Sequence, residues 1–250
     1  MDSRAGEDRG NLMSDLTIAI PVYNEADNIR FAVEKIEKEV IASHIIKIIY
    51  DMETDTTLPV VHELQKTYEN IELVKNLYGR GVLGAIKTGL ETSQTAYIVV
   101  TMADLSDPPQ VINEMVKIAE EQNASIVCAS RYMKGGKQIG GPFLKGLMSR
   151  FAGLTLHYLA RISTHDATNS FKLYRTSFLK EQKIESTGGF ELGLELVVKA
   201  HLQGKKICEI PTTWIDRVAG KSNFKLRAWL PNYLKWYFTA FKCKKKGETL

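Results

Sequence analysis

The sequence predicts an α/β fold, in which a mixed, mainly parallel sheet carries helices on both faces. Short β-branched runs recur at regular intervals in the first half of the chain, and a polar loop and a stretch of helical periodicity follow each one. Such alternation favours right-handed crossovers between parallel strands. The expected strands are Leu16–Ile20, Ile45–Tyr50, Ile71–Val74, Tyr97–Met102 and Ser125–Ala129.

Helices are expected between these strands because apolar residues recur there three or four positions apart, a spacing that places them on one face of a helix. The residues that mark these helices are Ile29, Val33, Ile36 and Val40, then Val61, Leu64 and Tyr68, then Val111, Met115 and Ile118. The pattern therefore predicts one amphipathic helix in each of three crossovers.

The second half of the chain is less regular. A glycine-rich loop at Gly135–Gly146 precedes an amphipathic stretch at Leu147–Arg161. We expect strands at Phe171–Tyr174 and Ile207–Trp214, and a helix at Phe190–Ala200. No linker rich in Pro, Gly or Ser separates the halves, so we predict a tail at residues 1–15, one domain at 16–226 and a terminal helix at 227–250.

Composition narrows the class of protein. The apolar fraction of 44% supports a well-buried core, and 33 basic against 29 acidic residues give a net charge of only +4. This balance argues against a surface built to bind nucleic acid. The three cysteines are widely spaced, the first fifteen residues lack the apolar segment of a signal peptide, and no apolar run reaches membrane-spanning length. We therefore expect a cytoplasmic protein.

Carboxylates follow the predicted strands at the edge where open α/β sheets bind ligands. Asp51 and Asp55 come after the second strand, Asp104 and Asp107 after the fourth, and Arg131 after the fifth. Because clustered carboxylates repel each other, a hard cation such as Mg²⁺ or Mn²⁺ would complement them and hold a diphosphate. The alternative is that Asp51, Asp55 and Asp107 are helix N-caps, which we favour for Asp55 and Asp107 but not for Asp51.

A glycine motif competes with this interpretation. Gly79–Gly84 matches GxGxxG, and Asp104 follows at the distance typical of a dinucleotide-binding fingerprint. However, the motif follows the third strand instead of the first, and Asp104 leads into a sharp turn. We prefer a stripe of small residues, Gly81, Ala85 and Gly89, that lets a helix pack closely on the sheet, and we rank an NAD-dependent oxidoreductase last.

Taken together, the motifs resemble inverting family-2 glycosyltransferases of the GT-A (Rossmann-like) fold. The resemblance covers about residues 16–226, and its second half is similar to the dolichyl- and polyprenyl-phosphate mannosyltransferase branch. The motifs that carry it are Pro21–Glu25, the Asp51 loop, Gly81-x-x-x-Ala85-x-x-x-Gly89, Ala103–Pro109, Ala129–Tyr132 with Gly135-Gly136, Asp166–Tyr174, and Glu209–Pro211 through Ser222.

The resemblance implies a role for particular residues. The donor-binding residues it implies are Pro21, Tyr23, Glu25, Asp51, Gly81, Ala103 and Asp104. The metal would be held by Asp104 with Ser106 and Asp107, and the catalytic residues would be Asp104 and Arg217. The acceptor phosphate would face Arg131, Lys145, Arg217 and Ser222.

The sequence departs from the family pattern at four positions. Tyr50 and Met102 stand where relatives usually carry Asp, Ser170 where they carry Gly, and Ser106 where many carry Gln. Loss of the carboxylate at Met102 leaves a thinner metal site, completed by Asp107, water and the donor phosphates. Loss of the carboxylate at Tyr50 affects recognition of the base or ribose.

The resemblance implies transfer of a hexose, of the mannose or glucose type, from GDP-mannose or a UDP-hexose to a polyprenyl phosphate. The terminal segment carries six aromatic residues and a lysine-rich flank, which favours peripheral contact with a membrane surface over a helix that only docks on the domain. The aromatics are Trp229, Tyr233, Trp236, Tyr237, Phe238 and Phe241. Two alternatives remain open, a transferase for a soluble or glycan acceptor and a non-catalytic subunit that binds nucleotide sugars.

Overall fold

The computed structural model describes residues 16–216 and 226–242. Its elements alternate between strands and helices in the first half, as the sequence predicts. In chain order they are β1 (Leu16–Pro21), α1 (Ala26–Glu39), β2 (His44–Tyr50), α2 (Thr57–Leu64), β3 (Ile71–Lys75), α3 (Val82–Thr92), β4 (Tyr97–Val100), α4 (Val111–Glu121), β5 (Ile126–Ser130), β6 (Lys137–Ile139), α5 (Phe143–Tyr158), β7 (Lys172–Arg175), α6 (Thr176–Lys180), α7 (Glu191–Leu202), β8 (Ile207–Pro211), β9 (Thr213–Ile215) and α8 (Leu226–Thr239).

The main sheet has seven strands in the order β3-β2-β1-β4-β7-β5-β8. Only β7 runs antiparallel to its neighbours, β4 and β5, and the other pairs are parallel. The predicted mixed, mainly parallel sheet is therefore confirmed. The stretch expected as one strand at Ile207–Trp214 is interrupted at Thr212, and its second part, β9, pairs with β6 in a separate two-stranded ribbon.

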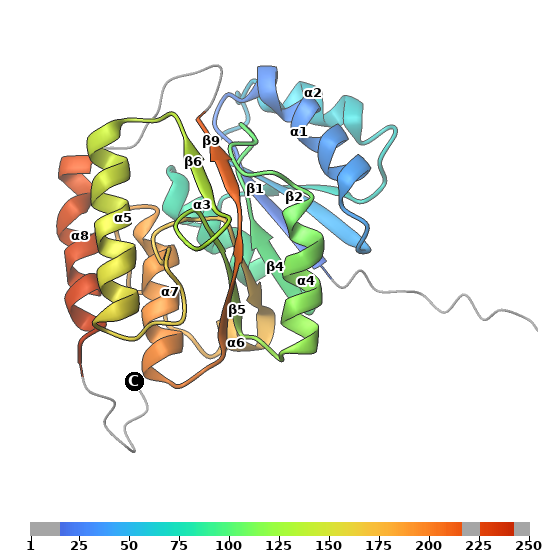
Figure 1. Cartoon of the computed structure of the whole chain (residues 1–250). Helices are drawn as coiled ribbons and strands as arrows, with labels where there is room; N and C mark the ends of the chain where they lie inside the picture. Colours follow the sequence, from blue (N-terminus) through green and yellow to red (C-terminus); the bar gives the residue numbers. More distant parts are fainter. Residues whose placement is uncertain (1–15, 217–225, 243–250) are drawn as a thin grey trace, which may run out of the picture.

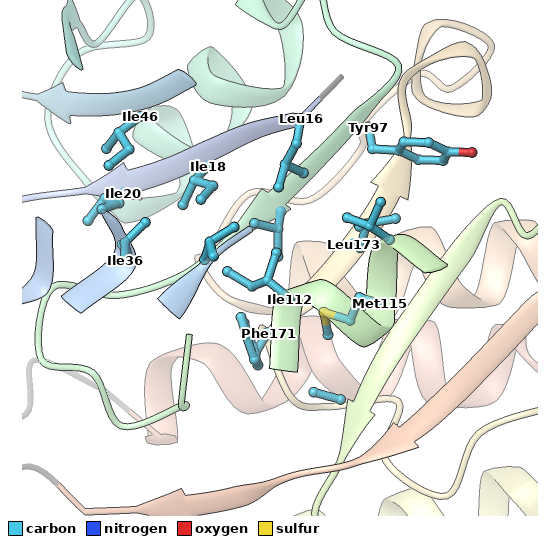
Figure 2. Packing of buried hydrophobic residues seen from close by; sticks show 14 of the residues in the cluster. Leu16, Ile18, Ile20, Ile36, Ile46, Tyr97, Ile112, Met115, Phe171 and Leu173 are labelled. Atoms are coloured by element: carbon cyan, nitrogen blue, oxygen red, sulfur yellow. The ribbon is translucent and has the colours of Figure 1, made fainter. Parts of the chain in front are cut away.

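Helices cover both faces of the sheet, as predicted. Helices α1, α2 and α4 lie on one side, while α5, α7 and α8 lie on the other (Figure 1). Isoleucines of β1 and α1 and the Ile112 and Met115 side chains of α4 form the core on the first side (Figure 2). These residues are fully buried, so the helical spacing in the sequence marks the faces that the sheet covers.

Helix α3 packs on the opposite face through small residues. Ala85 is buried, and a Cβ added at Gly89 would lie only 3.0 Å from the Cβ of Ala19 on β1. A larger side chain at Gly89 would push the helix away from the sheet. This close contact supports the small-residue interpretation for Ala85 and Gly89, whereas an added Cβ at Gly81 would have no atom within 4 Å, so Gly81 takes no part in the close packing.

The helices of the second half differ in detail from the prediction. Helix α5 begins at Phe143, four residues before the expected Leu147, and the short helix α6 has no counterpart in the sequence pattern. Helix α8 contains Pro231 and packs against α7 and α5. In the ranges that the structure describes, no helix is both long and apolar enough to cross a bilayer.

Candidate active site

A cavity of about 1140 Å³ opens at the carboxyl ends of the central strands. Every described residue that the sequence analysis assigned to a site lines it. These residues are Pro21, Tyr23, Glu25, Asp51, Gly81, Ala103, Asp104, Ser106, Asp107, Arg131 and Lys145. Arg217 and Ser222 lie outside the described residues. The structure thus brings the candidates to one place, while their individual roles remain predictions.

Asp51 fastens the loop that precedes α3. One carboxylate oxygen accepts a hydrogen bond from the Gly81 backbone N–H at 2.9 Å, and the other accepts one from the Asn76 side-chain amide at 2.7 Å. Gly81 has a φ of +124°, a conformation that favours glycine. Helix α2 begins only at Thr57, so Asp51 is not an N-cap. Asp51 lines the cavity, and its contact with a nucleoside stays a prediction.

Asp55 has a structural role, although the N-cap of α2 is Thr56 and not Asp55 as expected. Its carboxylate is buried and accepts hydrogen bonds from the Thr57 backbone N–H at 2.8 Å and from the Asn24 backbone N–H at 3.1 Å. Asn24 has a positive φ of 55°. Asp55 therefore fixes both the start of α2 and the strained loop that carries Tyr23 and Glu25 into the cavity.

The turn after β4 carries Asp104, Ser106 and Asp107. The Ser106 N–H donates to the Asp104 carboxylate at 3.1 Å. Asp107 is buried, which raises the pKa of its carboxyl group to about 7. Helix α4 begins at Val111, after Gln110, so the structure does not support an N-cap role for Asp107.

A divalent cation fits this turn only if the protein supplies some of its ligands and the substrate supplies the others. Among the residues that the structure describes, no three His, Cys, Asp or Glu side chains are grouped to hold a metal by themselves. Met102, where relatives carry a carboxylate, lines the cavity instead. Mg²⁺ commonly binds through one or two carboxylates together with substrate phosphates, and Asp104 with Ser106 and Asp107 offers that kind of partial oxygen set.

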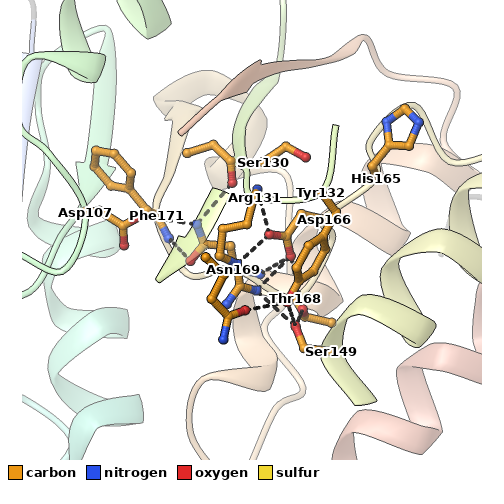
Figure 3. A network of polar contacts seen from close by, with 12 residues as sticks. Asp107, Ser130, Arg131, Tyr132, Ser149, His165, Asp166, Thr168, Asn169 and Phe171 are labelled. Carbon is orange, nitrogen blue, oxygen red and sulfur yellow. Dashed lines mark hydrogen bonds and ion pairs between the residues drawn. The ribbon is translucent and has the colours of Figure 1, made fainter. Parts of the chain in front are cut away.

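Arg131 forms a buried ion pair with Asp166 (Figure 3). The guanidinium donates from Nε and Nη2 to the two carboxylate oxygens at 2.7 and 2.9 Å, and the Arg131 backbone N–H donates at 3.1 Å. Burial opposes the charge on Arg131, but Asp166 outweighs it, so the pKa of Arg131 is raised. The residue lines the cavity as predicted, yet Asp166 balances its charge.

Hydroxyl groups extend this ion pair toward α5 (Figure 3). The Ser149 hydroxyl accepts from Arg131 Nη2 at 3.0 Å and lies 3.0 Å from the Tyr132 hydroxyl and 2.6 Å from the Thr168 hydroxyl. Ser149 and Thr168 line the cavity together with Lys145, one turn earlier on α5. This end of the cavity therefore presents hydroxyls and cationic side chains, which suit a phosphate.

The mouth of the cavity between α5 and α8 is apolar. Helices α5 and α8 line it, and their contributing residues are Met148, Phe151, Ala152, Leu230, Leu234, Tyr237 and Phe238. Phe151 and Phe238 are each 65% exposed, whereas Trp236 of α8 is buried in the core. Helix α8 thus docks on the domain through one face, which agrees with the alternative expectation for the terminal segment, while contact of its exposed aromatic side chains with a membrane stays a prediction.

Comparison with known proteins identifies the family. The description Glycosyl transferase family 2 matches residues 17–182, about two thirds of the sequence. This chain belongs to glycosyl transferase family 2. It is 26% identical over 213 residues to a dolichol-phosphate mannosyltransferase of Pyrococcus furiosus, which covers 84% of this chain and 59% of that relative. It is also 26% identical over 224 residues to an undecaprenyl-phosphate mannosyltransferase of Micrococcus luteus, covering 84% and 87%.

Solved structures confirm the fold of this family-2 member. A mannosyltransferase from Pyrobaculum calidifontis in complex with GDP-Man and Mn²⁺ has a TM-score of 0.64 at 15% identity, over 90% of this chain and 63% of that one. Glucosyl-3-phosphoglycerate synthase from Mycobacterium tuberculosis, with Mn²⁺ and UDP, has a TM-score of 0.66 at 13% identity, over 95% and 83%. The predicted GT-A fold is therefore confirmed.

Sequence reasoning missed several residues that line the cavity of this glycosyltransferase family member or contact the residues that line it. Asp166 and Asn169 belong to a motif that carried the resemblance, but they received no role in a site. Tyr132, Ser149 and Thr168 were also unassigned, although they form the hydrogen-bonded cluster beside Arg131. Most of these residues have polar neighbours in the sequence, so polarity alone neither singles them out nor reveals contacts between segments far apart in sequence.

Proposed function

We propose that this chain is an inverting glycosyltransferase that moves a hexose, of the mannose or glucose type, from a nucleotide sugar to a polyprenyl phosphate. The observation that carries the proposal is the continuity of one cavity. It runs from the loops after β1 and β2, past the Asp104 turn and the Arg131 cluster, to the apolar mouth between α5 and α8. A polar nucleotide, a phosphate and a lipid chain match these parts in that order.

The donor belongs at the polar end. The pocket for the nucleoside would be lined by Pro21, Tyr23, Glu25 and Asp51. Gly81 and Ala103 would also contact the donor. Asp104, with Ser106 and Asp107, would hold Mg²⁺ or Mn²⁺ against the diphosphate. When bound, the cation would stabilise negative charge on the leaving group.

The acceptor phosphate belongs beside Arg131 and Lys145. A phosphate oxygen is anionic near neutral pH, so its attack on the anomeric carbon needs no protein general base to remove a proton. The C–O bond to the nucleoside diphosphate breaks as the bond to the acceptor oxygen forms on the opposite face. Side chains near the acceptor need only hold and orient the phosphate, and we propose that Arg217 and Ser222 join in this.

The similar proteins support a lipid acceptor. The Pyrococcus and Micrococcus relatives are named for dolichol phosphate and undecaprenyl phosphate. The chain spans 59% of the length of the Pyrococcus relative, so the proposal rests equally on its own cavity. The exposed aromatic side chains at the mouth suit peripheral contact with the cytoplasmic face of a membrane, where such a lipid would be presented.

A transfer assay tests the proposal. The purified chain is incubated with Mn²⁺ and radiolabelled GDP-mannose or UDP-glucose, with a short polyprenyl phosphate as acceptor. We expect label to partition into organic solvent with the polyprenyl phosphate and not with the matching polyprenol, which lacks the phosphate. Transfer only to water-soluble acceptors would favour the soluble-acceptor alternative, and donor binding without any transfer would favour a non-catalytic subunit.

A further inference from the structure

The ribbon formed by β6 and β9 contributes two side chains to the cavity that the proposed function leaves without a role. Gln138 and Trp214 are partners in the parallel register of the ribbon and line the cavity side by side. Their sequence neighbours Ile139 and Ile215 point to the other face, where each is 51% exposed. The ribbon therefore has one face toward the cavity and one toward solvent.

Two sets of contacts fix where this inner face stands. The Ile215 backbone N–H donates to the carbonyl of Ser106 at 2.9 Å, which ties the ribbon to the turn that carries Asp104. The Tyr132 hydroxyl lies 3.1 Å from Gln138 Oε1 and 3.0 Å from Ser149 Oγ, which ties it to the cluster beside Arg131. The inner face of the ribbon thus lies between the turn that carries Asp104 and the cluster beside Arg131.

The packing around both side chains is close. A Cβ added at Gly141 would lie 3.2 Å from the Trp214 ring, and one added at Gly146 would lie 2.9 Å from Gln138 Nε2. Gly141 has a φ of +82°, a conformation that favours glycine. The absence of a side chain there also leaves room for the Trp214 ring. The indole and the amide are therefore held in position before any ligand arrives.

The chemistry of this pair suits a sugar ring. A pyranose has a face of C–H groups, which a flat aromatic ring covers well, and hydroxyls around its rim, which need hydrogen-bond partners. With Gln138 Oε1 accepting from Tyr132, the Nε2 group of the same amide is oriented as a donor. An apolar plane next to a fixed donor is the arrangement by which a site distinguishes one hydroxyl configuration from another.

We propose that Trp214 and Gln138 form the wall that binds the transferred hexose, with the Trp214 ring against the sugar and the Gln138 amide on one of its hydroxyls. This inference rests on the proposed function, since it assigns the sugar portion of the same donor. Trp214 and Gln138 then act as specificity residues, because they contact the hexose and not the nucleoside diphosphate.

The test compares a nucleotide sugar with its own nucleoside diphosphate. Calorimetric titrations with Mn²⁺ use GDP and GDP-mannose, and UDP and UDP-glucose, on the wild type and on Trp214→Ala, Trp214→Phe, Gln138→Leu and the outer-face control Ile139→Ala. We expect Trp214→Ala to weaken nucleotide-sugar binding about tenfold and Gln138→Leu about fivefold, with nucleoside diphosphate affinity within about twofold of wild type. Trp214→Phe retains a ring and should recover most of the loss.

The nucleoside diphosphate serves as the folding control within each variant. Equal losses for nucleotide sugar and nucleoside diphosphate, or no loss for either in Trp214→Ala and Gln138→Leu, would overturn the inference while leaving the proposed function intact. A change confined to the KM for the polyprenyl phosphate would also overturn it, because the ring would then contact the lipid. If the wild type binds neither nucleotide sugar, the proposed function fails, and the inference fails with it.

Discussion

The two ends of the cavity, called here the donor end and the acceptor end after their proposed ligands, are held in different ways. At the donor end, the carboxylates of Asp51 and Asp55 accept hydrogen bonds from neutral backbone N–H and amide groups. At the acceptor end, the carboxylate of Asp166 is fully buried and pairs with the charged guanidinium of Arg131. The donor end is thus fixed by dipoles and the acceptor end by a buried pair of opposite charges.

This difference determines how each end should respond to substitution. Loss of a carboxylate whose partners are neutral leaves unsatisfied N–H groups, which costs less than leaving a buried charge alone. The charge of Arg131 is balanced by Asp166. We therefore expect Arg131 to help shape the proposed acceptor site more than it adds net positive charge to it.

The largest expected effect is the loss of Asp166. Asp166→Asn keeps the shape of the side chain but leaves the Arg131 guanidinium, 11% exposed, without its counter-charge. We expect a loss of about 3–5 kcal/mol in the free energy of unfolding, the range for breaking one side of a buried ion pair. Urea unfolding measures it, with Asp27→Asn on the exposed side of α1 as the control.

A loss no larger than that of Asp27→Asn would show that Arg131 finds water or another partner in the variant. The contrast between the two ends of the cavity would then disappear. The double variant with Arg131→Met sharpens the test, because it removes both charges and should be more stable than Asp166→Asn alone.

The second effect is on the donor end, through Asp55. Asp55→Ala removes the acceptor for the Asn24 and Thr57 backbone N–H groups. We expect it to lower the free energy of unfolding by about 1–3 kcal/mol, less than Asp166→Asn, because no charge is stranded. Thermal unfolding with Glu53→Ala, an exposed neighbour, as the control measures the difference. A cost equal to that of Asp166→Asn would contradict the proposed contrast.

The sequence predicted the donor end well because its geometry is local. Asp51 follows β2 and Asp104 follows β4, and the carboxyl ends of parallel strands meet at one edge whatever the details of the fold. The apolar residues that recur at helical spacing from Ile29 to Ile36 marked the buried face of α1 for the same reason. Both arguments need only the position of a residue in its own strand or helix.

The acceptor end was not predictable by these rules. Arg131 and Asp166 are 35 residues apart, and they meet because β7 enters the sheet antiparallel between β4 and β5. Strand β7 was expected from its sequence, but neither its direction nor its place in the sheet was. The position of Arg131 after a strand therefore predicts that it lies at the rim, but its partner Asp166 depends on the strand order, which the sequence pattern does not reveal.

The third effect is on donor binding alone. Asp104→Asn removes a carboxylate from the turn at the cavity and leaves the side-chain volume unchanged. We expect Mn²⁺-dependent affinity for the nucleotide sugar to fall at least about tenfold, equivalent to about 1.4 kcal/mol, with stability close to wild type. Titrations with Mn²⁺ and with EDTA measure it. Affinity that is equal to wild type under both conditions would remove Asp104 from the predicted metal site.

The smallest effect on stability is expected at the apolar mouth, where the consequence for function should be large. Phe151 on α5 and Phe238 on α8 are each 65% exposed, so little of either ring is buried by folding. Phe151→Ser and Phe238→Ser should therefore change the free energy of unfolding by no more than about 0.5 kcal/mol. Phe31 on α1 is 63% exposed on the other side of the sheet, which makes Phe31→Ser a matched control.

Vesicle sedimentation separates these three variants. A phenylalanine ring that enters the lipid interface gains about 1.5–3 kcal/mol, so each substitution at the mouth should weaken binding to phosphatidylcholine vesicles by about tenfold or more. Phe31→Ser should bind like the wild type, because α1 lies on the face of the sheet away from α5 and α8 (Figure 1). Equal binding by all three variants would show that the aromatic face does not meet the membrane. The open mouth would then have to admit its acceptor from solution, which favours a water-soluble acceptor over a polyprenyl phosphate.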